Sequence, residues 1–239
     1  MAKSIYIAPT ETKSGKSLII LGIMQLLLKD IRIVGFFRPI INPPEKNGKD
    51  HDIDLVLSYF YIGLQYEETY AFTMEEAKQM INSGRQSEMM ETILNKYKQL
   101  EEKCRFVLCE GTDFAAGNEA FEFDINADIM AVLGSPAIVV SNGFQKGIDE
   151  VVSSNQLSIE SLEHKGVDVL GIIVNRVDPL CREVLKKTLK QAIYRSDCRY
   201  FAAPFGLRHH PAGKKGRCLS ENPGIGLKSF RGKDHTAGE

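Results

Sequence analysis

The chain has 239 residues, a formal net charge of −1, and 43% hydrophobic and 26% charged residues. These proportions are ordinary for a soluble globular protein made of one α/β domain, or of one domain with an appendage. The balanced charge provides no whole-molecule attraction to nucleic acid or to a membrane surface, so we expect neither as a partner.

Two further features bear on the cellular compartment. The five cysteines are scattered without a paired short spacing, which predicts reduced thiols, not a disulfide framework or a zinc site. The N-terminus lacks a basic-then-apolar signal pattern, and the longest apolar run, residues 18–28, is too short to span a bilayer. We therefore expect a cytoplasmic protein.

The first predicted strand leads from residue 5 into the polar segment Thr-Glu-Thr-Lys-Ser-Gly-Lys-Ser at residues 10–17, and the apolar run follows. This layout predicts a phosphate-binding loop, although the strict pattern has a glycine where this chain has Thr10. The residues expected to bind the nucleotide are Thr12, Lys13, Ser14, Gly15, Lys16 and Ser17. Lys16 would bind the β- and γ-phosphates and Ser17 the metal, with a helix N-terminus capped by Ser14 as the alternative.

The next elements predict a βαβ unit. Residues 18–28 form a helix that is apolar nearly all round, so we expect it to be covered on most sides. Residues 32–37 form a second strand, which ends at Arg38-Pro39 because proline cannot donate in a β-ladder. A helix between two apolar strands implies that those strands are parallel.

The middle of the chain is predicted to be mainly helical. Residues 51–62 form one helix, and Thr73 with Glu76 fits a capping box at the start of another. Residues 87–103 carry apolar side chains at helical spacing and form a third helix.

Strands and helices alternate from there on. Further strands are predicted at residues 105–109, 137–140, 167–174 and 199–203, with helices at 124–133, 147–165 and 179–195. The alternation predicts an α/β fold with a doubly wound, mostly parallel sheet and helices on both faces, as in P-loop NTPases. We assign residues 1–203 to this nucleotide-binding domain. Residues 204–239 hold seven Lys/Arg against three Asp/Glu, are rich in glycine, and show no periodicity, which predicts a poorly ordered basic tail.

Ligands of an open parallel sheet bind beyond the carboxyl ends of its strands. Glu110 follows the third apolar strand, and we predict that it holds Mg²⁺, with a helix-capping or surface carboxylate as the alternative. Asp54, or its neighbour Asp52, is expected to complete the metal ligands with Ser17, although any helix start favours carboxylates.

Two other residues at this edge are predicted to contact the ligand. The Asn175 amide offers a donor and an acceptor to a nucleotide base, and a turn before Pro179 is the alternative. Arg38 can bind a carboxylate or phosphate through two hydrogen bonds, or merely cover the sheet edge. The expected cofactors are ATP, or another nucleoside triphosphate, and Mg²⁺.

These residues resemble a known family. The loop 10–17, Arg38-Pro39, Glu110-Gly111 and Asn175-Arg176 look like the P-loop fold shared by dethiobiotin synthetase and the cobyrinic acid a,c-diamide synthases. Residues 107–114 and 120–129 are similar to the N-terminal domain of the long-form phosphate acetyltransferases. The resemblance covers residues 3–177 and is most specific in that middle block.

The resemblance implies an ATP- and Mg²⁺-binding regulatory domain that works beside an acetyltransferase domain or in a homo-oligomer. Long-form enzymes carry the acetyltransferase domain last, so we expect its active site to lie outside this chain, and we assign no catalytic residue. The alternative is an ATP-dependent ligase resembling dethiobiotin synthetase. That family has a lysine where this chain has Arg38, which argues against the ligase, while Lys16 and Ser17 are intact.

The end of the chain departs from the resemblance. Relatives would continue after the last strand with an acidic, proline-containing turn and a further helix, and residues 204–239 give no such pattern. We therefore expect a truncated or frame-shifted chain, with the native reading lost near residues 199–206.

Overall fold

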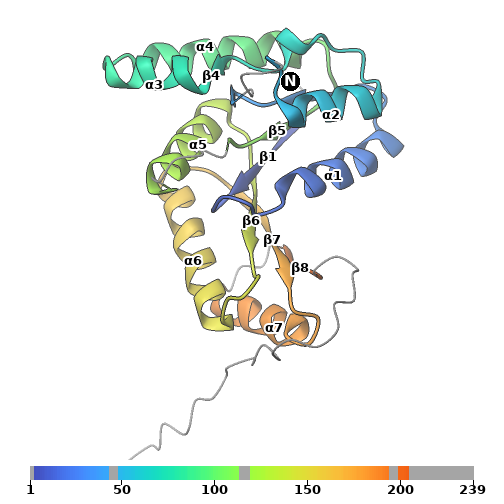
Figure 1. Cartoon of the computed structure of the whole chain (residues 1–239), viewed down its shortest axis with the longest axis vertical. Coiled ribbons are helices and arrows are strands. Elements are labelled where there is room, and N and C mark those ends of the chain that lie inside the picture. The colour runs from blue at the N-terminus through green and yellow to red at the C-terminus, as the bar shows by residue number, and fades with distance from the viewer. Residues whose placement is uncertain (1–2, 43–47, 113–118, 194–198, 205–239) are drawn as a thin grey trace, which may run out of the picture.

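A computed structural model describes residues 3–42, 48–112, 119–193 and 199–204. Its main sheet has six strands in the order β2-β5-β1-β6-β7-β8 (Figure 1). Their bounds are β1 (Lys3–Pro9), β2 (Val34–Phe37), β5 (Phe106–Glu110), β6 (Ala137–Asn142), β7 (Val169–Val177) and β8 (Arg199–Pro204). Every neighbouring pair is parallel, and a small parallel sheet joins β3 (Ile40–Ile41) to β4 (Phe72–Thr73). The predicted doubly wound parallel α/β fold is confirmed.

Helices cover both faces of this sheet (Figure 1). They are α1 (Lys16–Asp30), α2 (His51–Phe60), α3 (Met74–Asn82), α4 (Gln86–Glu101), α5 (Glu119–Leu133), α6 (Ile148–His164) and α7 (Arg182–Ala192). Successive residues of β1 alternate between the two cores, because strand side chains point to opposite faces in turn. Tyr6 and Ala8 pack in the core shared with α3 to α7, whereas Ile7 packs in the core shared with α1 and α2.

The strand order places the polar loop at the centre of the molecule. The connection from β1 leads through α1 to β2 on one side, whereas β6 lies on the other side of β1. The carboxyl end of β1 is therefore the point where the winding direction changes, and this is where open α/β sheets form their ligand crevice.

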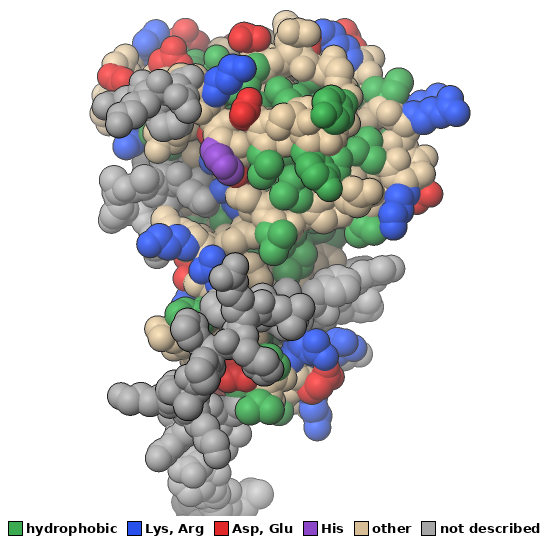
Figure 2. Space-filling view, turned by 45° about the vertical axis from the view of Figure 1, so that its right-hand side comes forward, with side chains coloured by type: hydrophobic (Ala, Val, Ile, Leu, Met, Phe, Trp, Pro, Cys, Tyr) green, Lys and Arg blue, Asp and Glu red, His purple; other side chains and the backbone are tan. Residues whose placement is uncertain are grey.

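The prediction that the first helix is covered on most sides is wrong. Ile20 and Met24 are buried, but Leu18 and Leu26 are 71% and 60% exposed. The helix has only one buried face because it lies at the surface of a single sheet layer. Figure 2 shows hydrophobic side chains gathered on the face of the molecule that this view brings forward.

The cysteines also differ in part from the prediction of reduced thiols. Cys104 and Cys109 are free, as predicted, and both are buried. Cys181 is disulfide-bonded, which contradicts the prediction for this residue. Residues 205–239 also lie outside the described part of the chain, so the predicted tail and the proposed loss of reading frame stay predictions.

The capping box at the start of α3 is confirmed. The Glu76 carboxylate accepts from the Thr73 amide at 2.8 Å, and the Thr73 hydroxyl accepts from the Glu76 amide at 3.3 Å. These two bonds satisfy backbone donors that a helix start otherwise leaves without partners.

Replacing Thr73 with alanine is expected to lower the free energy of unfolding by about 1 kcal/mol, because it removes the side chain that caps α3. Urea denaturation measures this change. Thr92→Ala is the matched control, since the Thr92 hydroxyl donates to the Glu88 carbonyl one turn earlier in α4 and caps no helix start. Its effect should stay within about 0.5 kcal/mol. Equal losses in the two variants would contradict the assigned role of the cap.

Candidate functional site: a phosphate-binding loop beside a buried ion cluster

The segment between β1 and α1 is held by contacts with β6 and with the residues that follow β6. The Thr10 amide donates to the Val140 carbonyl of β6 at 3.0 Å. The Glu11 carboxylate accepts from Lys146 Nζ at 2.8 and 2.7 Å, and from the Asn142 amide at 3.1 Å. The loop is thus fixed to the neighbouring strand and to the segment that follows it.

Gly15 is required at its position for two independent reasons. Its φ of +79° lies in the left-handed region, which side chains other than glycine rarely adopt. A Cβ at this position would lie 2.3 Å from Asn175 Nδ2, which donates to the Ser14 carbonyl at 2.9 Å. Asn175 therefore packs directly against the loop and holds its backbone.

The N-terminus of α1 has no side-chain cap. Gly15 is the N-cap residue, and no side-chain cap hydrogen bond is made at this helix start. The alternative of a cap by Ser14 is wrong, because the Ser14 hydroxyl oxygen is buried without a hydrogen-bond partner among the described residues. A helix start with a positive dipole end and no side-chain cap is suited to bind an anion.

A cluster of buried charges lies beside this helix start. Lys16 Nζ lies 3.2 Å from Glu110 Oε1 and 3.8 Å from Asp52 Oδ2. Arg38 Nη1 lies 3.2 Å from the same Glu110 oxygen and also pairs with Asp52. Arg38 Nε is 3.5 Å from Asp50 Oδ2, so two cations meet three carboxylates. We call these five residues the ion cluster.

Each member of the ion cluster is placed by the end of an element. Arg38 directly follows β2 and Glu110 closes β5, whose strands are neighbours, so both reach the same edge of the sheet. Asp50 is the N-cap of α2 and accepts from the Asp52 and Ile53 amides. This cap orients the first turn of α2, which directs Asp52 toward Lys16.

The backbone that follows Glu110 is held by a polar network in the core. Asn126 Oδ1 accepts from the Tyr6 hydroxyl at 2.8 Å and from the Thr112 amide at 3.1 Å. The Asn126 side-chain amide donates to the Thr112 carbonyl at 3.0 Å, and the Gly111 amide donates to the Ile7 carbonyl at 2.9 Å. The network ties the end of β5 to β1 and α5, so Glu110 has little freedom to move.

The environment shifts the pKa of the two carboxyl groups in opposite directions. Burial raises the pKa of Glu110 to about 7, even though Arg38 and Lys16 favour its charged form. Burial also opposes ionisation of Asp52, but Arg38, Lys16 and a hydrogen bond from Ser17 outweigh it and lower the pKa to about 2. The pKa of Arg38 is raised by its three carboxylate neighbours in spite of burial.

The structure brings most of the predicted site residues together. Ser17 donates to Asp52, and Lys16, Arg38 and Glu110 form the cluster described above. Lys13 is exposed at the loop, with a φ of +58°. Asp54 is exposed on α2 and, among the described residues, forms no ion pair with Lys16 or Arg38. Asp52, the alternative to Asp54, is the carboxylate of this helix start that pairs with Lys16 and Arg38.

Asn175 lies at the loop, but both of its polar groups already have partners in the chain. Its Nδ2 donates to the Ser14 carbonyl, and its Oδ1 accepts from the Arg176 amide at 2.9 Å. The contact to a base stays a prediction, while its contact to the loop is what the structure shows.

Sequence reasoning missed Asp50 and the ion pair between Glu11 and Lys146. Asp50 directly precedes a predicted helix, and the preference for aspartate at the N-cap could have identified it. The two partners of the ion pair are 135 residues apart, and no local pattern in the sequence relates them.

The oxygen groups of the site fit Mg²⁺ only together with a phosphate ligand. In the described part of the chain, no three His, Cys, Asp or Glu side chains are arranged to hold a metal ion alone. Glu110 Oε2 is nevertheless buried without a hydrogen-bond partner among the described residues. Mg²⁺ is commonly bound by one or two carboxylates together with substrate phosphates and water. The carboxylates of Glu110 and Asp52 with the Ser17 hydroxyl suit that arrangement.

The fold and the loop define a P-loop NTPase-like domain. Residues 3–196 match the family described as AAA domain, and the chain therefore belongs to this family. It is 49% identical over 192 residues to a phosphate acetyltransferase of Nitratidesulfovibrio vulgaris, a match covering 80% of this chain and 27% of that protein. It is 34% identical over 191 residues to the phosphate acetyltransferase of Synechocystis sp., again covering 80% and 27%.

The chain thus spans 27% of the length of these two acetyltransferases. It is also 27% identical over 184 residues to the ATP-dependent dethiobiotin synthetase of Clostridium perfringens, which covers 74% of this chain and 79% of that protein. The predicted resemblance to both groups is confirmed.

Solved structures support the fold. The Cyanothece McdA–ATP complex matches with a TM-score of 0.52 at 13% identity, covering 84% of this chain and 82% of that one. A Pyrococcus abyssi GTPase in apo form, PAB0955, matches with a TM-score of 0.50 at 13% identity, covering 84% and 90%. Within the described residues, no helix has both the length and the apolar character that crossing a bilayer requires.

Glu110→Gln should change how stability depends on pH. An acid whose pKa rises on folding binds its proton more tightly in the folded state. Glu110 therefore contributes most to the free energy of unfolding at pH values below its unfolded pKa, near 4.5. That contribution is lost as the pH rises through the folded value of about 7. Glutamine does not titrate, so the variant lacks this loss. Its free energy of unfolding relative to that of wild type should rise by up to about 3 kcal/mol between pH 4.5 and pH 8.

Urea denaturation at these two pH values measures the difference. Glu102→Gln is the matched control, because Glu102 is an exposed residue outside the ion cluster, and its stability should follow wild type at both pH values. If the free energy of unfolding of Glu110→Gln also matched that of wild type at both pH values, the assignment of a raised pKa to Glu110 would be wrong.

Proposed function

We propose that this chain binds ATP together with Mg²⁺ and acts as a regulatory P-loop domain in a phosphate acetyltransferase-type protein. The observation that carries the proposal is Lys16, held between two carboxylates at an uncapped helix start. A lysine so placed supplies a positive charge to a phosphate, and the carboxylates supply oxygen ligands to a divalent cation.

Different residues would bind the phosphates and the metal ion. The loop amides from Lys13 to Ser17 and the Lys16 ammonium would hold the β- and γ-phosphates. Ser17, Asp52 and Glu110 would hold Mg²⁺, whose charge offsets that of the phosphates. The predicted metal ligand Asp54 is less suited, because it is exposed on α2.

Arg38 links the proposed metal site to the start of α2, and this link is the basis of the proposed regulatory role. It is 5% exposed and pairs with the two carboxylates proposed for the metal, Asp52 and Glu110. When those carboxylates take up a metal ion, Arg38 must share them, and Asp50 stays as its partner at the start of α2. Ligand binding is thereby expected to alter the contacts that hold α2, a local change that a neighbouring domain can sense.

The partner in this role would be an acetyltransferase domain or a second copy of the chain, in the cytoplasm. Similarity to two phosphate acetyltransferases over 80% of the chain supports this choice. The competing function is an ATP-dependent ligase, supported by the match to 79% of a dethiobiotin synthetase. Arg38 favours the regulatory role because a permanently charged guanidinium in three ion pairs is poorly suited to move protons or to act as a nucleophile.

Lys16→Ala should weaken the binding of ATP with Mg²⁺ at least tenfold, because the phosphates lose their only buried cation from the loop. Isothermal titration calorimetry of the full chain with ATP, GTP and ADP measures the change. Lys29→Ala, at the exposed far end of the same helix, is the control and should bind as wild type does. No binding by the wild type would overturn the proposal, and turnover of ATP that depends on a carboxylate substrate would favour the ligase.

Asn175→Ala is expected to weaken ATP and GTP by the same factor, roughly three- to tenfold, because its amide holds the Ser14 carbonyl and so the shape of the loop. The same calorimetry gives both affinities. A change in the ratio of the two affinities would show instead that Asn175 reads the base.

A further inference from the structure

The guanidinium of Arg176 lies beside the phosphate-binding loop. Arg176 Nε would be 3.9 Å from a Cβ placed on Gly15, which is the N-cap residue of α1. The side chain comes from β7, which is separated from β1 by β6 in the sheet (Figure 1). A second cation besides Lys16 is therefore close to the helix start at which phosphates are proposed to bind.

A β-bulge turns Arg176 toward the loop. Val174 pairs with Ala202 of β8 and Val177 pairs with Pro204, so β7 has one residue more than β8 over this interval. In a regular strand Val174 and Val177 would point to opposite faces, yet both pack in the same core. The extra residue leaves Arg176 beside Gly15, as Asn175 is. Bulges near active sites commonly re-aim a side chain in this way.

The backbone of Arg176 has a conformation that arginine rarely adopts. Its φ of +57° lies in the left-handed region, which favours glycine and asparagine. Lys13, at +58°, is the other basic residue of the described chain with a positive φ, and it belongs to the loop. Such conformations cost stability and cluster at ligand-binding sites. The position of the Arg176 side chain is thus obtained at some cost to the fold.

The chain does not balance the charge of Arg176 within its described residues. The guanidinium makes no ion pair and no side-chain hydrogen bond there. Glu11, the acidic residue of the loop, pairs with Lys146, and Asp178 accepts from the Leu180 amide. The positive end of the α1 dipole also disfavours a cation at this place. Interactions inside the chain therefore do not explain why an arginine is placed here.

Two buried polar groups at the same site give an independent indication of a ligand. The Ser14 hydroxyl oxygen and Glu110 Oε2 have no hydrogen-bond partner among the described residues. Ser14 is 1% exposed and Glu110 is 0% exposed. Because buried polar groups nearly always have partners in folded proteins, a ligand that carries phosphate oxygens and a metal ion would satisfy both.

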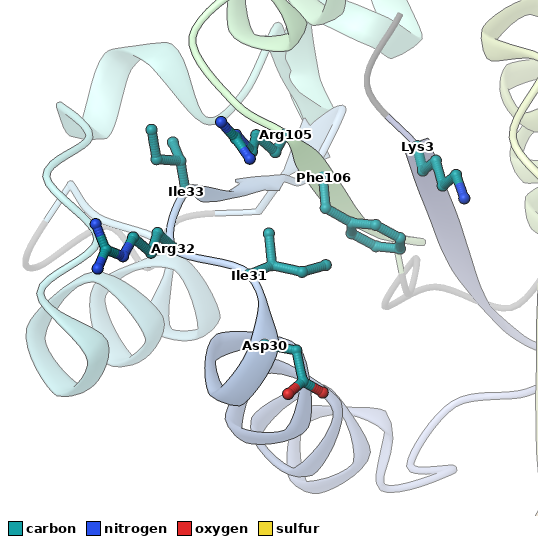
Figure 3. Close-up of a pocket in the computed structure, with 7 residues that line it drawn as sticks. All are labelled: Lys3, Asp30, Ile31, Arg32, Ile33, Arg105 and Phe106. Atoms are coloured by element: carbon teal, nitrogen blue, oxygen red, sulfur yellow. The ribbon is translucent and has the colours of Figure 1, made fainter.

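Another basic region of the protein lacks these features. Lys3, Arg32 and Arg105 line a pocket of about 690 Å³ where β1, β2 and β5 begin and α1 ends. Figure 3 shows their side chains pointing away from one another, and none of the three has a positive φ. Exposed basic side chains alone therefore do not indicate an anion site, and Arg105 provides a control for Arg176.

We propose that Arg176 binds the α-phosphate of the nucleotide, the phosphate that is joined to the ribose. Glu110 and the metal ion would lie on the β5 side of the loop, with the β- and γ-phosphates at Lys16. Arg176 reaches the loop from the β7 side, where the remainder of the nucleotide would lie beside Asn175. This assignment rests on the proposed binding of ATP with Mg²⁺.

Calorimetric titration of the full chain with ATP and Mg²⁺ tests the assignment. Arg176→Gln should weaken binding roughly tenfold, because it removes charge-assisted hydrogen bonds to a phosphate. Arg176→Lys should recover part of the affinity, since it keeps the charge but not the planar pair of donors. Arg105→Gln, the same change at an exposed arginine directly before β5, should bind as wild type does.

Phosphorus NMR of the bound nucleotide identifies the phosphate concerned. At saturation, Arg176→Gln should shift the α-phosphorus signal of bound ATP relative to wild type and leave the β and γ signals in place. Arg176→Gly separates binding from folding. It should bind as weakly as Arg176→Gln, while its urea midpoint should not fall below that of wild type, because glycine readily adopts a positive φ.

The results distinguish this assignment from the function on which it rests. Unchanged ATP affinity in Arg176→Gln, or a shift of the γ signal in place of the α signal, would overturn the assignment and leave the proposed function intact. A lowered urea midpoint in Arg176→Gly would also overturn it, because Arg176 would then support the fold. No binding of ATP by the wild type would overturn both.

Discussion

The ion cluster at the carboxyl edge of the sheet is the constraint on which the site depends. Burying charges is costly, and removing one partner of a buried pair typically costs about 3–5 kcal/mol. Lys16, Arg38 and Glu110 are each at most 5% exposed. They are held by the ends of β2 and β5 and the starts of α1 and α2. The geometry of these element ends therefore has to be accurate for the fold to be stable.

A cluster of buried ion pairs is not the most stable way to fill the interior at this edge of the sheet. Well-packed apolar residues often serve a core at least as well as buried ion pairs. The raised pKa of Glu110 shows that its charged form is disfavoured where it lies. A disfavoured carboxylate and a lysine at a helix N-terminus without a side-chain cap are instead understandable as groups prepared for a ligand that carries both phosphate and metal charge.

Much of this arrangement was predictable from the sequence, because the signals are local. The alternation of apolar strands and helices predicted the sheet, and Gly15-Lys16-Ser17 predicted the loop that follows β1. The outcome for α1 was not predictable, since an apolar sequence alone does not show that Leu18 and Leu26 lack covering elements. The choice between Asp52 and Asp54 likewise depended on the rotation of α2, which the cap at Asp50 determines. The contact of Asn175 with Ser14 joins residues 161 positions apart, so no sequence spacing indicates it.

The central claim is that Lys16 and the carboxylates beside it bind a nucleotide with its metal ion. A crystal structure of the full chain grown with Mg²⁺ and a non-hydrolysable ATP analogue tests this most directly. We expect the terminal phosphates at the loop, with Lys16 Nζ in contact with them and the metal ion close to Ser17 and Glu110. A structure from saturating analogue in which the loop holds no nucleotide, and Lys16 still pairs with Glu110, would contradict the claim.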